Sequence, residues 1–168
     1  MQLSQVLTAI TPVRAADRER ALAKWNAVAK PLGSLGLLED AVTQICAATG
    51  TLEPRISKRA VAVFCADNGV VAQGVTQTGS EVTAIVAGNV CTGATSVCKM
   101  ARVAGADVFP IDMGMNTSVD DPRMWNRRIA AGTKDMSQGP AMTREEAVRA
   151  LEAGVSVAEE LAARGYGL

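Results

Sequence analysis

The chain has 168 residues and carries 17 lysines and arginines against 17 aspartates and glutamates, so its formal net charge at pH 7 is zero. This balance excludes a strongly basic nucleic-acid-binding module, because such modules present a positive surface to the phosphate backbone. A hydrophobic fraction of 48% with 20% charged residues excludes a disordered chain and is typical of one globular domain.

Histidine is absent from the sequence. Its absence excludes a Ser/His/Asp triad, a Cys/His pair and an imidazole-bound zinc ion from these residues. The cysteines show no CxxC spacing and are interpreted as reduced thiols that behave as small buried hydrophobic residues. They are Cys46, Cys65, Cys91 and Cys98.

The N-terminal residues contain no basic stretch followed by an apolar core, so we expect no secretory signal. The longest apolar run, Ala60 to Ala66, is far shorter than the roughly 18 residues of a membrane span. We therefore expect a cytoplasmic protein that does not cross a membrane.

Residues 1–55 predict a helical N-terminal segment with two helices and an irregular loop. Apolar residues recur at helical spacing in residues 17–29 and again in residues 37–48, which end near a glycine. The loop between them, KPLGSLG, offers a lysine, a hydroxyl and backbone N–H groups that could cradle a phosphate. It matches no phosphate-binding motif, so a tight turn is the simpler interpretation.

Two short apolar runs predict parallel strands. Residues 60–66, AVAVFCA, lack polar alternation, which is typical of a strand covered on both faces. Residues 107–113, DVFPIDM, are similar but include Pro110, which cannot donate to a ladder and indicates an edge position or a bulge.

Residues 78–104 continue a helical stripe between the two strands and complete a βαβ unit. Thr78 and Glu81 stand at the spacing of a capping box. Gly88 and Gly93 disfavour one long helix, so we expect two helices with a break near Gly93.

Residues 116–142 are polar and irregular, and a second capping box, Thr143 with Glu146, then opens a helix that runs to Gly165. The alternation predicts an α/β fold, Rossmann-like, with a parallel sheet and flanking helices. A further strand is expected to receive the last helix, so residues 56–168 are interpreted as the first part of an α/β domain, incomplete at its C-terminal end.

Each predicted strand ends at an aspartate, Asp67 in the turn Asp-Asn-Gly and Asp112 in Asp-Met-Gly. The carboxyl ends of parallel strands lie at one edge of the sheet, where ligands of open α/β sheets bind. The structural alternative is that each aspartate forms an Asx turn or caps a helix. For Arg127 and Arg128 a solvated face is the simpler alternative to anion binding, and for Asn89 we expect a buried amide with a structural hydrogen bond.

Five segments, in order, resemble one family, nicotinate-nucleotide:dimethylbenzimidazole phosphoribosyltransferase. They are KPLGSLGLLED (30–40), VFCADNGVVAQGV (63–75), EVTAIVAGN (81–89), AGADVFPIDMGM (104–115) and QGPAMTREEA (138–147). The resemblance implies transfer of phosphoribose from nicotinate mononucleotide to 5,6-dimethylbenzimidazole or a related base, giving α-ribazole 5'-phosphate and nicotinate in cobamide assembly. It further implies a cytoplasmic homodimer that acts on small molecules. We expect no metal or cofactor, and the charge balance and short apolar runs above predict no nucleic-acid or membrane partner.

The family's general base is a glutamate near the far C-terminus, so the resemblance implies that it lies beyond Leu168 and that no catalytic residue is present here. The chain alone is then expected to be inactive. An alternative is a non-catalytic α/β binding or regulatory subunit that acts with a partner chain.

The resemblance places a wall of the base pocket at Thr78 and Val86, where the family commonly has serine and glutamine. Asn68 stands where the family usually has histidine. The expected substrate-binding residues are Asp67, Asn68, Gly69, Thr78, Val86 and Asp112. Because a valine offers no hydrogen bond, the substitutions suggest a pocket that selects its base by shape.

Overall fold

The computed structural model describes residues 2–167. These residues form two compact units: residues 6–56 make one, and residues 57–167 with 2–5 make the other. A compact unit need not fold alone, so the predicted domain boundary after residue 55 stays a prediction. No helix within the described residues is both long and apolar enough to cross a membrane.

Helices α2 (Ala15–Asn26) and α3 (Leu37–Thr49) pack on each other in the first unit. Their contact buries Ala21, Cys46 and Ala47. Helix α3 ends as predicted at Gly50, which has a left-handed φ of 67°. Helix α1 (Leu3–Ala9) is not foreseen from the sequence pattern, and its first backbone N–H donates to the Glu152 carboxylate at 2.8 Å.

The loop KPLGSLG is closed by an ion pair. The Lys30 ammonium lies 2.7 Å from the Glu39 carboxylate, and the side chains are 13% and 7% exposed. Glu39 also accepts a hydrogen bond from the Leu35 N–H at 3.0 Å. The lysine lowers the pKa of Glu39 from its ordinary value. The loop forms turns, and its only lysine is already paired with Glu39, which supports the interpretation as a tight turn.

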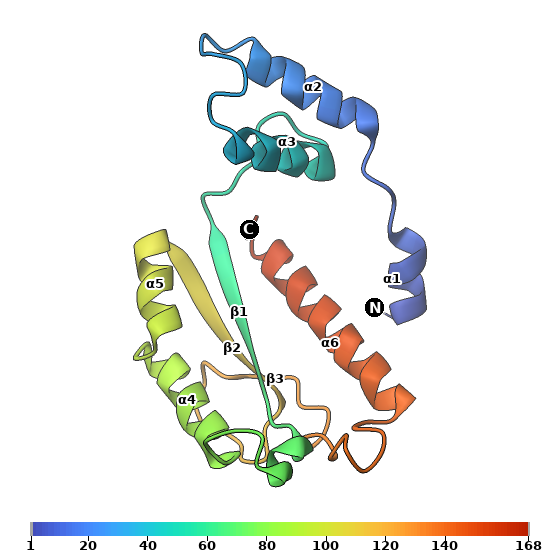
Figure 1. The fold of residues 1–168 in the computed structure, drawn as a ribbon, viewed down its shortest axis with the longest axis vertical. Helices are drawn as coiled ribbons and strands as arrows, with labels where there is room; N and C mark the ends of the chain where they lie inside the picture. Colours follow the sequence, from blue (N-terminus) through green and yellow to red (C-terminus); the bar gives the residue numbers. More distant parts are fainter. Residues whose placement is uncertain (1, 168) are drawn as a thin grey trace. The chain divides into compact units, whose positions relative to one another are not determined.

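The second unit contains a parallel sheet in the order β1-β2-β3, formed by β1 (Arg59–Ala66), β2 (Ala106–Gly114) and β3 (Trp125–Asn126). Helices α4 (Glu81–Thr92) and α5 (Ser96–Ala104) connect β1 to β2 and lie on one face of the sheet. Helix α6 (Arg144–Ala163) lies on the other face (Figure 1). The predicted α/β fold with a parallel sheet and flanking helices is confirmed.

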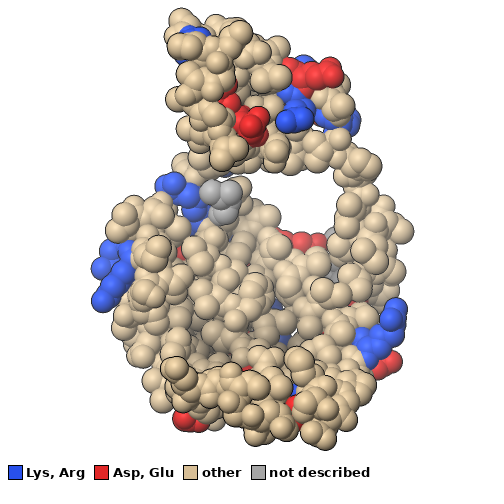
Figure 2. Space-filling view, viewed as in Figure 1, with Lys and Arg blue, Asp and Glu red and all other residues tan. Residues whose placement is uncertain are grey.

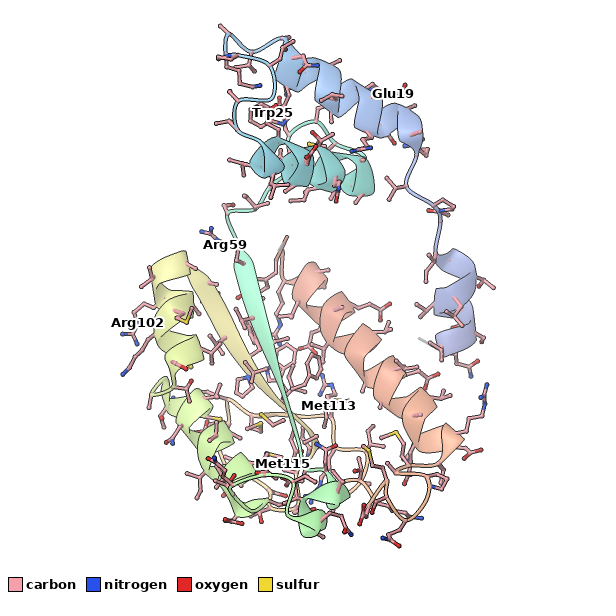
Figure 3. The ribbon with its side chains drawn as sticks, viewed as in Figure 1. Glu19, Trp25, Arg59, Arg102, Met113 and Met115 are labelled. Carbon is pink, nitrogen blue, oxygen red and sulfur yellow. The ribbon has the colours of Figure 1, made fainter. Side chains whose placement is uncertain are left out.

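The core beneath α6 is built on alternate residues of β2. Ile111 is fully buried and packs with Val157 and Leu161 of α6, while Phe109 and Met113 pack at its margin. In Figure 3, Met113 lies on the side of the sheet that faces α6. The opposite face is closed by buried small residues of α4 and α5, namely Ala87, Val90, Cys91, Cys98 and Ala101.

The cover over β1 is thinner than predicted. Phe64 is 48% exposed, so the predicted cover on both faces, although helices lie on either side of the sheet (Figure 1), is incomplete at this residue. Three of the four cysteines are buried, Cys65 is half-buried, and all are free thiols. Burial raises the pKa of Cys65 and of Cys91.

Pro110 lies in the central strand of the described sheet, without a bulge at its position. The edge prediction is therefore wrong for the strand. Locally, however, β3 pairs only with Ile111 and Asp112, which leaves Pro110 with one neighbouring strand. The irregularity in the ladder falls instead between Cys65 and Ala66 of β1.

The helix boundaries confirm two of the three local predictions. Helices α4 and α5 are separated at Gly93, whose φ is 78°. Thr143 and Glu146 form the capping box of α6, with bonds of 3.1 and 2.8 Å. The box predicted at Thr78 and Glu81 does not form, since α4 begins after Ser80.

Candidate functional site

Asp67 connects the end of β1 to two other segments. The residue is 4% exposed, and its Oδ2 accepts a hydrogen bond of 2.6 Å from the Asn116 N–H, beyond β2. Its own N–H donates to the Gly114 carbonyl, and its carbonyl accepts from the Thr133 N–H, both at 3.0 Å. Asp67 therefore fixes the end of β1 against the turn after β2 and against the loop that follows β3.

Asp112 is equally buried, at 3% exposed. Its Oδ1 accepts hydrogen bonds of 2.9 Å from the N–H groups of both Gly114 and Met115. This is the turn-forming role given above as the structural alternative for Asp112. The two aspartates do meet at one edge of the sheet, as predicted, and each bonds the backbone of residues 114–116.

Gly69 lies in a position that only glycine can fill. A Cβ atom on Gly69 would lie 2.6 Å from the backbone of Thr133 and Lys134. The Gly69 N–H donates to the Thr133 hydroxyl oxygen at 3.2 Å. Gly69 thus brings the first turn after β1 into direct contact with the loop after β3, a contact that the sequence did not reveal.

Hollow A, as we name it, lies between the end of β1 (residues 63–68), Val71, and the segment 76–86 that leads into α4. Its volume is about 400 Å³. Asp67, Asn68, Thr78 and Val86 all line it. Four of the six residues predicted to bind substrate are therefore brought together at one hollow, whereas Gly69 and Asp112 line neither hollow A nor the one described next.

Hollow B has a volume of about 470 Å³ and shares residues 66–68 with hollow A. Its remaining wall comes from Met113 and Gly114, the loop 129–134, and residues 141–150 at the start of α6. The sequence does not predict this hollow, because residues 116–142 show no periodic pattern. The small residues of IAAGT (129–133) are the available signal that a backbone approaches closely there.

Several polar groups at the two hollows have no hydrogen-bond partner within residues 2–167. They are the Asn68 side-chain amide, the Thr78 hydroxyl and the Lys134 ammonium group. In contrast, Gln73 donates to the Asp135 carboxylate at 2.6 Å and ties the short helix η1 (Gly69–Gln73) to the loop that follows β3. Bonds from Ser137 and Gln73 lower the pKa of Asp135.

The arginines predicted as a solvated pair have separate structural partners. The Arg127 guanidinium lies 2.8 Å from the Glu160 carboxylate, whereas Arg128 donates to the Ser118 hydroxyl at 2.6 Å. The prediction that Asn89 carries a buried amide is wrong, because this residue is exposed. Its backbone carbonyl accepts a hydrogen bond from the Ala94 N–H.

The charged side chains do not gather into one patch on the face in view (Figure 2). On the face shown in Figure 2, lysines and arginines form small groups separated by uncharged surface. Within residues 2–167, no cluster of aspartate, glutamate and cysteine side chains is suited to hold a metal ion. The two hollows lie at the carboxyl edge of a parallel sheet, the edge at which ligands of open α/β sheets bind.

Comparison with known proteins gives a family. A family model described as phosphoribosyltransferase matches residues 10–168. The chain belongs to this family. Two curated relatives carry the name nicotinate-nucleotide–dimethylbenzimidazole phosphoribosyltransferase. That of Geobacter metallireducens is 42% identical over 93% of this chain and 44% of its own length. That of Clostridium tetani is 36% identical over 99% of this chain and 46% of its own length.

A solved structure of the same enzyme name from Thermus thermophilus matches with a TM-score of 0.83 at 35% identity. The match covers 90% of this chain and 46% of that protein. The recognition made from the five sequence motifs is thereby confirmed. The chain spans less than half the length of these relatives.

Proposed function

We propose that this chain supplies one part of a phosphoribosyltransferase that moves phosphoribose from nicotinate mononucleotide to 5,6-dimethylbenzimidazole or a related base. The products are α-ribazole 5'-phosphate and nicotinate, and the reaction belongs to cobalamin biosynthesis in the cytoplasm. The family match and the names of the relatives support the reaction. The observation that supports a substrate site in this chain is that Asp67, Asn68, Thr78 and Val86 all line hollow A.

Hollow A receives the acceptor base. A flat aromatic base fits a hollow of about 400 Å³ whose wall is largely apolar, with Val63, Val71 and Val82 among its members. The Thr78 hydroxyl and the Asn68 amide are among the lining groups able to hydrogen-bond its ring nitrogens. Val86, which is 46% exposed, contributes shape and no hydrogen bond.

The chemistry requires a base that these aspartates do not supply. The bond from the ribose carbon to the pyridinium nitrogen breaks, and its electron pair stays with nicotinate. A new bond then forms to a nitrogen of the azole, whose N–H proton passes to a carboxylate. Asp67 and Asp112 already accept backbone hydrogen bonds, so we place the general base in a glutamate outside this chain.

The test follows nicotinate release from nicotinate mononucleotide and 5,6-dimethylbenzimidazole. The chain is assayed alone and then with a separately produced polypeptide that corresponds to the unmatched part of the Geobacter metallireducens relative. We expect release only after mixing. Full activity of the chain alone would contradict the external base, and no release in any mixture would contradict the transferase.

A non-catalytic binding subunit is the second candidate. The observation that favours it is the engagement of both buried aspartates with backbone N–H groups, which leaves them as structural residues. Base binding without nicotinate release in any mixture would support this role. We further propose a homodimer, and sedimentation at several concentrations tests that state separately.

A further inference from the structure

One wall of hollow A is formed by residues 70–80, which run from the short helix η1 to the start of α4. Val71, Thr76 and residues 78–80 of this wall line the hollow. No residue of η1 is buried, and a 3-10 helix of five residues is too short to be stable alone. The position of the wall therefore depends on the bonds that join it to the rest of the molecule.

The wall is attached at two points to the loop that follows β3. At the start of η1, the Gly69 N–H donates to the Thr133 hydroxyl oxygen at 3.2 Å. At its end, the Gln73 side-chain amide donates to the Asp135 carboxylate at 2.6 Å. Among the described residues, this second bond is the only hydrogen bond from residues 70–80 to another segment. In Figure 1, the green segment after β1 meets the orange loop at this place.

The Asp135 carboxylate is held ready for its bond to Gln73. Its Oδ1 accepts hydrogen bonds from the N–H and the hydroxyl of Ser137, at 2.9 and 2.8 Å, which leaves Oδ2 for Gln73. The Lys134 N–H donates to the Ala141 carbonyl at 2.7 Å and closes the loop. The loop is thus a preformed support, and its ionised carboxylate makes a stronger hydrogen bond than a neutral acceptor.

We propose that Gln73 is a positioning residue for the acceptor base, because its bond to Asp135 holds Val71 and the residues that follow in place along hollow A. This inference rests on the proposed function, in which hollow A receives the base, and adds a residue that does not touch the base. Gln73 does not line the hollow, so it acts through Val71. When its bond is absent, the base must order the wall as it binds, which weakens binding.

The experiment is a titration of the intact chain with 5,6-dimethylbenzimidazole. Gln73→Met keeps a side chain of similar length and removes the donor. We expect the dissociation constant for the base to rise roughly three- to tenfold, as for the loss of one hydrogen bond. Gln73→Lys returns a donor at a similar distance from the backbone and should restore the affinity to within about twofold of the parent chain.

Gln138→Met is the matched control. Gln138 lies in the same loop, and its side-chain amide donates to the Ser137 hydroxyl at 3.2 Å instead of to η1. This variant should leave the dissociation constant for the base unchanged. The methyl NMR signals of Val71 give a second measurement without ligand: they should shift in Gln73→Met and stay in place in Gln138→Met.

The mixed enzyme separates positioning from chemistry. In Gln73→Met, the KM for the base should rise by the same factor as its dissociation constant, whereas kcat should stay within about twofold of the parent value. The reason is that the Val71 wall contacts the base equally before and during the reaction, so its loss weakens binding in both states.

Three results would overturn the inference: an unchanged dissociation constant in Gln73→Met, no recovery in Gln73→Lys, or equal losses in Gln73→Met and Gln138→Met. Absence of base binding by the parent chain would overturn it together with the placement of the base in hollow A. Base binding that depends on Gln73, without nicotinate release in any mixture, would remove the transferase and leave the role of Gln73 standing.

Discussion

The two units of this chain handle their buried acidic groups in different ways. In the helical unit, Asp17 pairs with Arg14 and Arg20, and Glu39 pairs with Lys30 besides accepting one bond from the Leu35 N–H. In the α/β unit, Asp67 and Asp112 accept hydrogen bonds from backbone N–H groups. A side-chain pair holds one element in place, whereas a backbone bond fixes the course of the chain itself. The site lies where the backbone is fixed.

The largest expected effect comes from Gly69→Ala, which tests how closely the turn after β1 and the loop after β3 must meet. The new Cβ atom would lie 2.6 Å from backbone atoms of residues 133 and 134, so the two segments must separate. We expect a loss of about 2–4 kcal/mol in the free energy of unfolding, measured by urea denaturation.

Gly154→Ala is the matched control for that substitution. Gly154 lies within α6, and a Cβ atom there would meet nothing within 4 Å. Because alanine is the better helix former, the control should gain up to about 1 kcal/mol. Equal losses in both variants would show that the contact of Gly69 is unimportant.

The next prediction compares two substitutions of Asp112, one that removes its hydrogen-bond acceptor and one that removes only its charge. Asp112→Ala leaves the N–H groups of Gly114 and Met115 without their acceptor, and we expect a cost of about 1–3 kcal/mol. Asp112→Asn keeps an acceptor oxygen and should cost clearly less. Thermal denaturation of the two variants measures the difference, and equal losses would indicate that the charge of Asp112 itself is required.

The helical unit should respond to pH through Glu39. Because Lys30 lowers the pKa of Glu39 in the folded state, this pair stabilises the fold above the unfolded-state pKa of the glutamate. The contribution is lost as the pH falls through the lower, folded-state pKa. We therefore expect Glu39→Gln to lower the melting temperature at neutral pH and to match the parent chain in acid. A constant difference at every pH would contradict the role of this ion pair.

The smallest effect on stability, and the most specific one on function, is expected for Val86→Gln. Val86 is 46% exposed, so its replacement should leave the free energy of unfolding within about 0.5 kcal/mol. In the mixed enzyme, the new amide should favour bases that offer a ring nitrogen over phenols of similar shape. Competition between the two kinds of acceptor measures the ranking, and an unchanged ranking would remove Val86 from base selection.

Features that depend on neighbouring residues or on chain topology could be predicted from the sequence. The capping box of Thr143 and Glu146 depends only on residues close in sequence. The approach of Asp67 to Asp112 follows from the parallel pairing of the two strands that they end. The same spacing at Thr78 and Glu81 failed because the Thr78 backbone bonds to the Thr76 hydroxyl in a preceding turn. The short strand β3 could not be foreseen, since two residues carry no periodicity and pair only through distant residues.

Hollow B could not be foreseen for a related reason. Its wall joins residues from the end of β1, the end of β2 and the loop 129–134, and the bonds between them run from backbone to backbone. Such bonds do not depend on side-chain type, so they leave no pattern in the amino-acid sequence. The bond from the Asn116 N–H to Asp67 Oδ2 and the close approach of Gly69 to Lys134 were hidden because they join residues far apart in the sequence.

Because the loop 129–134 is anchored through backbone N–H groups, the side chains of residues 129–131 are free to differ without a change in the path of the chain. Replacements at Ile129, Ala130 or Ala131 would alter the lining of hollow B while the bonds to the strands remain. Evolution could therefore retune ligand preference at this loop by single substitutions, with little penalty in folding.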